Sequence, residues 1–194
     1  APSMARAMRE RRRREERPAG RRVTVATGRS RFGRSIGVIG VPMPTIDPLV
    51  VSRSARALDR YGPDFRYGHF LVARSALPTA ASVAGEVGAA VLARLRRSEP
   101  VTGPTAAQRA KNWFRVTFVG EVTEGDHKGH RVVTEVSGGD PGYGETATML
   151  GQSALCLAHD DLKPTAGQLT TAVAMGNALI DRLDRAGMPF RVLS

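Results

Sequence analysis

The segment SGGDPGYGETA, residues 137–147, carries the most suggestive chemistry in the sequence. Its two adjacent glycines permit a sharp turn, and Asp140 followed by Pro141 is typical of the capped first turn of a helix. Tyr143 and Glu145 then emerge beside the N-terminus of that helix, where the free N–H groups and the positive dipole end favour anions. The segment is either a substrate-facing edge or a plain connection from a strand to a helix.

Other reactive side chains have simpler structural explanations. The stretch DHKGH, residues 126–130, offers an aspartate and two histidines, but it lies in a predicted turn and a catalytic zinc needs three well-placed ligands. We therefore expect no metal. His69 is expected to be half-buried in a strand, and His159 to lie near a helix C-terminus, where a cation is favoured. Cys156, in the apolar run ALCLA, is expected to be buried and unreactive.

The nearest sequence to a phosphate-binding loop is VTVATGRSRFGRSIG, residues 23–37, in which Gly28 and Gly33 follow a possible strand. It contains neither G-x-G-x-x-G nor G-x-x-x-x-G-K-[ST], and no helix is predicted to follow it. We therefore expect no cofactor-binding residues in this chain.

Positive charge is concentrated at the N-terminus. Residues 1–35 hold twelve arginines and three glutamates, a net +9, so the remaining 159 residues carry only +2 of the total +11. Such a run can neutralise phosphates on nucleic acid or on an anionic membrane, but it contains hardly any aromatic residues and matches no nucleic-acid-binding module. We expect residues 1–22 to form a basic helix or arm in solvent, with nucleic acid the less favoured partner.

Composition indicates a globular chain. Of its 194 residues, 41% are hydrophobic, and a single cysteine excludes an internal disulfide. No window of the sequence is apolar and uncharged enough for a membrane span, and no signal peptide is recognisable, so a cytoplasmic location is expected. Peripheral membrane contact stays open, because the predicted helix 79–97 ends in a group of arginines.

Strand and helix signals are mixed along the chain. A helix is predicted within residues 45–62, where Asp47 is suited to capping, Pro48 to the first helical position and Gly62 to a left-handed exit. The alternation of PDFRYGHFLVA, residues 63–73, predicts one strand. The other predicted strands are 23–27 with 36–41, as one hairpin, 113–122 with 131–136, as a second hairpin, and 190–193.

Two further helices are predicted, roughly at residues 141–158 and 171–186, the latter with Val173, Gly176, Ile180 and Leu183 as its buried stripe. Because the strands come as hairpins between helices, we predict an α+β fold with an antiparallel or mixed sheet covered by helices. Residues 23–194 are predicted to form one domain after the basic arm, and no Rossmann domain is expected in the chain.

The C-terminal segments resemble a known family. VVTEVSGGDPGYGETATMLGQSALCLA and TAGQLTTAVAMGNALIDRLDRAGMPFRVL are similar to the C-terminal portion of saccharopine-dehydrogenase-like proteins, especially the bacterial trans-acting enoyl reductase group. VPMPTIDPLVVSRSARALDRYGPDF and AKNWFRVTFVGE resemble earlier stretches of the same group, in the same order.

The resemblance implies a two-domain reductase. An N-terminal Rossmann domain, absent from this chain or separately encoded, is expected to bind NADPH or NADH, and residues 171–186 are expected to pack on it. The substrate-side α+β domain is expected to serve reduction of a carbon–carbon double bond in a hydrophobic acyl or polyketide substrate. No catalytic residue can be carried over, and the isolated chain is expected to be inactive.

Two segments are expected to face the active-site cleft, residues 137–146 and 168–176. Their substrate-facing candidates are Asp140, Tyr143, Glu145, Thr170 and Thr171. A homodimer is compatible with the sequence. The alternative function is a non-enzymatic basic accessory protein that binds nucleic acid or anionic lipid through its arginine-rich arm.

Overall fold

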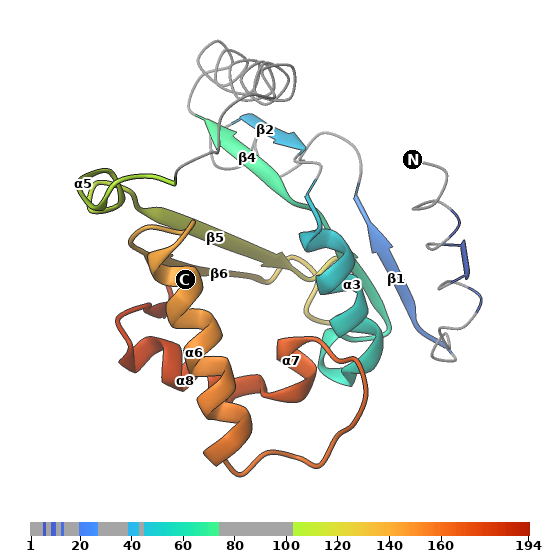
Figure 1. Cartoon of the computed structure of the whole chain (residues 1–194). Coiled ribbons are helices and arrows are strands. Elements are labelled where there is room, and N and C mark those ends of the chain that lie inside the picture. Colours follow the sequence, from blue (N-terminus) through green and yellow to red (C-terminus); the bar gives the residue numbers. More distant parts are fainter. Residues whose placement is uncertain are drawn as a thin grey trace. The chain divides into compact units, whose positions relative to one another are not determined.

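The chain divides into two compact units, Ala1–Ser75 and Ala76–Ser194 (Figure 1). The predicted helix 79–97 and most of the arm 1–22 fall outside the described residues, and the expected boundary after residue 22 stays a prediction. The described residues of this computed structural model are 6, 9, 10, 13, 20–26, 39–42, 45–73 and 103–194.

The first unit combines one parallel and one antiparallel strand pair. The predicted hairpin of 23–27 with 36–41 is wrong, because the first of these strands pairs in parallel with one more than 35 residues later in the chain, as in Val23 opposite Phe65. A parallel pair needs a long crossover, and a helix lies within it. The elements are β1 (Arg22–Val25) with β3 (Asp64–Tyr67), β2 (Ile39–Pro42) with β4 (Phe70–Ala73), helix α3 (Asp47–Ala57) and the 3₁₀ turn η1 (Asp59–Tyr61).

Helix α3 forms where it was predicted, but its first turn differs in detail. Asp47 is the first helical residue and not the cap, because the capping position belongs to Ile46 and carries no side-chain cap. Pro48 stands in the first turn, where its missing N–H costs nothing. Ala55 is fully buried, and Gly62 has a φ of 75°, the left-handed conformation that its position predicted.

The predicted single strand 63–73 is two strands in two different sheets. They separate at Gly68, where any side chain would lack room: a Cβ would lie 2.5 Å from Cε2 of the Phe70 ring and 3.2 Å from Cβ of Ala26. The residues before the break alternate between polar and apolar (DFRY), whereas those after it are all apolar (FLVA), and the prediction of one strand passed over this change.

The second unit is a three-stranded antiparallel sheet with helices on one side. The predicted hairpin is confirmed, and the C-terminal strand joins its second strand at the edge. The elements are α5 (Ala106–Arg109), β5 (Phe114–Glu121), β6 (Arg131–Gly138), α6 (Gly144–His159), α7 (Thr171–Ala174), α8 (Gly176–Arg185) and β7 (Phe190–Val192), with the sheet order β5-β6-β7. The described residues are thus α+β with mixed strand pairing, as predicted.

One hydrophobic core holds the second unit together. It lies between one face of the sheet and the helices α6 and α8, with Phe114 and Val116 of β5 packed at its margin. Met188, just before β7, is almost completely buried and joins the last helix to the last strand. The buried members are Val136, Cys156, Met175, Leu179, Leu183 and Met188.

The predicted helix 171–186 is broken at Gly176, whose φ of 52° interrupts the helical backbone. The break changes which side chains face the core. Met175, Leu179 and Leu183 are buried, whereas Ile180, predicted to lie in the buried stripe, is exposed. The sequence pattern assumed continuous helical phase through residue 176, and that assumption fails.

Among the described residues, no helix has both the length and the apolar character needed to cross a membrane.

Candidate functional site

Asp140 organises the loop between β6 and α6. It is buried, and its Oδ2 accepts hydrogen bonds from the backbone N–H groups of Tyr143 at 2.8 Å and Gly144 at 3.1 Å. Its Oδ1 accepts a bond of 2.7 Å from the side-chain amide of Asn112. The Asn112 bond, with smaller help from the two backbone N–H groups, lowers the pKa of Asp140. Asp140 therefore binds N–H groups at the start of α6, but the helix begins at Gly144 and not at residue 141 as predicted, and its N-cap position belongs to Tyr143. Asn112 is a partner that sequence reasoning did not identify.

Glu145 closes the same loop from the helix side. Its Oε1 accepts a hydrogen bond of 2.9 Å from the backbone N–H of Gly139. The Gly138 and Gly139 positions are filled closely, since a Cβ on Gly138 would lie 2.7 Å from Cε1 of the Phe114 ring and 3.2 Å from the Glu145 carboxyl carbon. Asp140 and Glu145 therefore hold the glycine pair in place.

Tyr143 lies on the outside of this loop and is 52% exposed. The guanidinium carbon of Arg109, at the end of α5, is 5.9 Å from the centre of its ring, a cation–π distance. The short helix α5 begins with a capping box between Thr105 and Gln108, which fixes the chain just before Arg109. Tyr143 is thus placed by α5 as well as by its own loop.

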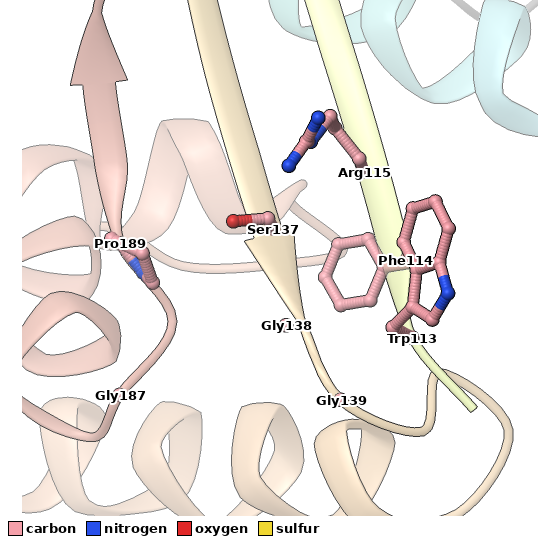
Figure 2. Close-up of a pocket in the computed structure, with 8 residues that line it drawn as sticks. All are labelled: Trp113, Phe114, Arg115, Ser137, Gly138, Gly139, Gly187 and Pro189. Carbon is pink, nitrogen blue, oxygen red and sulfur yellow. The ribbon is translucent and has the colours of Figure 1, made fainter. Parts of the chain in front are cut away.

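An open pocket of about 430 Å³ lies beside the glycine pair (Figure 2). Arg115 and Ser137 are directly opposite each other on β5 and β6, so both side chains project from the same face of the hairpin. The Arg115 guanidinium lies 6.0 Å from the Trp113 ring centre and 3.5 Å from Oε2 of Glu135. The pocket is lined by Trp113, Phe114, Arg115, Ser137, Gly138, Gly139, Gly187 and Pro189.

The pocket contains part of one predicted segment and none of the five predicted side chains. Ser137, Gly138 and Gly139 belong to the predicted stretch 137–146, whereas Asp140 and Glu145 bind backbone N–H groups of the same loop without lining the pocket. Thr170 precedes α7 and Thr171 begins it, so they are on a different element from the loop. The structure therefore brings Asp140, Tyr143 and Glu145 together, and the substrate-facing role of all five stays a prediction.

Sequence reasoning missed Trp113 and Arg115 at the pocket. Trp113 is 71% exposed although it is the only tryptophan of the chain. An exposed tryptophan next to an arginine at the start of a strand is an unusual surface feature, and both residue types are enriched where proteins bind partners. In the sequence, the observable sign of this feature was Trp113 two residues before Arg115 at the start of a predicted strand.

A second polar cluster fastens α6 to α8. Arg182 donates two hydrogen bonds of 2.6 Å from Nε and Nη2 to the two carboxylate oxygens of Asp160. The Arg182 bonds, followed by a bond from the Cys156 thiol, lower the pKa of Asp160 to about 2. Burial, then the same contact with Asp160, raises the pKa of Cys156. The expectation of a buried, unreactive thiol is confirmed as to burial, and the raised pKa keeps the thiol protonated.

His69 belongs to a polar cluster in the first unit. Its Nδ1 is 3.4 Å from the Tyr67 hydroxyl and 3.9 Å from Oδ2 of Asp47. Burial, with a smaller contribution from Asp47, raises the pKa of Tyr67, so its hydroxyl remains a neutral donor. The histidine is half-buried and partnered, as expected, but it lies in the connection between β3 and β4 and not in a strand.

Among the described residues, no group of histidine, cysteine and acidic side chains could hold a metal ion. His127 and His130 are exposed in the turn between β5 and β6, with ring centres 5.3 Å apart.

The loop before α6 also resembles a dinucleotide-binding turn in its spacing, since GYGETA fits G-x-G-x-x-A. The geometry does not fit the phosphates of such a cofactor. The two N–H groups of Tyr143 and Gly144 are already bonded to the Asp140 carboxylate, whose negative charge repels phosphate. The preceding strand belongs to an antiparallel hairpin and not to a parallel βαβ unit.

Known proteins similar to this chain are named as reductases. A protein of Mycobacterium tuberculosis named as a trans-acting enoyl reductase is 34% identical over 168 residues, covering 77% of this chain and 39% of the relative. The trans-acting enoyl reductase of Mycobacterium ulcerans is 32% identical over 158 residues, covering 72% and 37%. A bovine saccharopine dehydrogenase-like oxidoreductase is 35% identical over 101 residues, covering 47% and 24%.

The chain therefore belongs to the saccharopine-dehydrogenase-like family that includes the trans-acting enoyl reductases. The two mycobacterial proteins match more than seven tenths of it. The chain spans about two fifths of the length of these relatives. No protein-family profile and no solved structure matches it.

Proposed function

We propose that this chain is the substrate-side part of an NAD(P)H-dependent oxidoreductase that reduces a carbon–carbon double bond in a hydrophobic acyl or polyketide intermediate. The Rossmann part that binds NADPH or NADH, whether encoded in the same gene or separately, is proposed to lie outside residues 1–194. The names of the relatives support the reaction class. A cytoplasmic location stays a prediction.

The observation that carries the proposal is the pocket beside the braced glycine loop. Gly138 and Gly139 contribute backbone to its lining; Glu145 binds the N–H of Gly139, and Asp140 binds the N–H of Tyr143 further along the loop. Such a lining lets a substrate approach closely and keeps its shape on binding. In the proposal, Trp113 provides apolar contact and Arg115 a cation for a polar group of the substrate.

No reaction step is assigned to a side chain of this chain. The loop does not fit cofactor phosphates, so the proposed contribution is to bind and orient the substrate. Residues 1–194 alone are accordingly expected to show no NAD(P)H oxidation.

The test is a chimera in which residues 1–194 replace the matched region of the M. tuberculosis relative. With NADPH or NADH and a long-chain trans-2-enoyl thioester, the chimera should oxidise the cofactor while the chain alone should not. Trp113→Ala with Arg115→Met should raise KM roughly 10-fold, because one lost pocket contact of this kind is worth about 1–2 kcal/mol. Arg66→Met, an exposed arginine of β3, is the matched control and should leave KM unchanged.

Turnover by the chain alone would refute the proposal. A chimera that oxidises NADPH with the same KM in the Trp113→Ala, Arg115→Met variant would refute the role of the pocket and leave the reaction class standing.

A further inference from the structure

Helix α6 presents an apolar face on its outside as well as its inside. Its inner side reaches the core through Cys156, which is fully buried. On the outer side Leu150 is 72% exposed and Leu157 60% exposed. We define the outer face of α6 by its exposed residues at helical spacing, Ala147, Leu150, Gly151, Ala154, Leu157 and Ala158.

No charged residue interrupts this helix between Glu145 and His159. A surface helix normally carries charged side chains opposite its buried stripe, and a helix that is apolar on all sides is normally enclosed by protein. In the same unit α8 follows the normal pattern, since it buries Leu179 and Leu183 and exposes Asp181 and Arg185. The outer face of α6 is therefore an apolar surface of the kind that is normally buried against other protein, and here it is exposed to solvent.

We infer that the outer face of α6 is the surface on which the remainder of the family's polypeptide packs. Three observations support that occupant. The mycobacterial relatives extend well beyond the matched region, which is only 39% of the M. tuberculosis protein, so more than half of that polypeptide lies outside the match. The face is uncharged, as buried domain contacts usually are. The helix is fastened to its own unit at both ends, by Asp140 at the start and by the Asp160–Arg182 pair at the end, so it offers a preformed surface.

The inference differs from the expectation based on resemblance, which placed the docking helix at residues 171–186. The apolar stripe of α7 and α8 is used inside the second unit by Met175, Leu179 and Leu183. The larger uncovered apolar surface belongs to α6. The inference relies on family membership and on the extra length of the relatives, and it does not need the proposed chemistry at the pocket.

The test compares thermal unfolding of the full chain with that of the chimera described above. The variant is Leu150→Glu with Leu157→Glu. The matched control is Val132→Glu with Val192→Glu, which makes the same change of charge at two exposed valines of the sheet, 51% and 76% exposed. The readout is the melting temperature and needs no substrate, so it is independent of whether the chimera reduces anything.

We expect the α6 variant to lower the melting temperature of the chimera by about 5 °C or more, because two carboxylates would be buried at the contact. The chain alone should melt as the unsubstituted chain does, and the control pair should change neither protein. Three results would overturn the inference: an unchanged chimera, an equal fall in the chain alone, which would mean that its own residues cover α6, or a dimer of the chain alone in light scattering that the α6 variant dissociates.

Discussion

The two ends of α6 are both held by an aspartate, but by different physical means. At the start, Asp140 accepts hydrogen bonds only from neutral donors, the Asn112 amide and two backbone N–H groups. At the end, Asp160 faces the guanidinium of Arg182 through two short bonds. The first network shapes a loop and the second joins two helices by charge. Removing charge should therefore matter most at the C-terminal end.

The largest effect is expected from Arg182→Met. The substitution leaves the half-buried Asp160 carboxylate beside Cys156 without its counter-charge, which is more costly than the loss of an exposed pair. The melting temperature at pH 7 should fall by roughly 5 °C or more, measured by circular dichroism. Arg66→Met, an exposed arginine of β3, is the control. Equal melting of the two variants would contradict the assigned role of the pair.

The next largest effect is the loss of folding stability at low pH that Asp160 causes. The folded pKa of Asp160 is about 2, below the ordinary value of about 4, so the folded state binds its proton less readily than the unfolded state. Its contribution to stability is fully present above pH 4 and is lost as the pH falls toward 2. In urea titrations from pH 6 to pH 2, Asp160→Asn should lose less stability in this window than the unsubstituted chain. Asp161→Asn, exposed and adjacent, should behave as the unsubstituted chain does.

At the N-terminal end of α6, a neutral side chain should retain part of the stabilisation that Asp140 provides. Asp140→Ala removes the two bonds to N–H groups at the start of α6 and the Asn112 contact, and the melting temperature should fall by about 3 °C. Asp140→Asn keeps one acceptor oxygen, and the fall should be about half as large. Asp126→Ala in the exposed turn is the control. If Asp140→Asn proved as damaging as Asp140→Ala, the carboxylate charge would matter at both ends, and the contrast would fail.

The smallest effect of removing a contact altogether is expected from Cys156→Ala. The thiol adds a bond to Asp160, but Arg182 makes the main contacts, so the melting temperature should fall by roughly 2 °C and by less than in Arg182→Met. Differential scanning calorimetry of both variants gives the comparison. A larger fall for Cys156→Ala would show that packing of the thiol, and not the ion pair, fastens the helix.

The sequence predicted the second unit better than the first. The β5–β6 hairpin was visible because alternation, turn residues and a short connection all point to a local antiparallel pair. The pairing of β1 with β3 could not be predicted in this way. Four residues of strand composition do not indicate which distant strand they pair with, and Asp64, the partner of Arg22, lies 42 positions later in the chain. Likewise the bonds from Asp140 to the start of α6 join residues close in sequence and were approximately predicted, whereas its bond to Asn112 depends on the tertiary position of β5.

The pocket was predictable only in part, for the same reason. The glycine loop is one continuous segment and could be singled out, but Trp113 and Pro189 reach the pocket from positions 76 residues apart. Only the register of the three strands brings them to one place.

The parallel pairing of β1 with β3 has a consequence for the order in which the chain acquires structure. Synthesis releases β1 well before β3, because the hydrogen-bond partners at Pro63 and Tyr67 follow only after α3 has left the ribosome. The β5–β6 hairpin, with about nine residues between its strands, closes in microseconds once made. β1 therefore waits for β3 for some seconds at ordinary translation rates of about 5–20 residues per second.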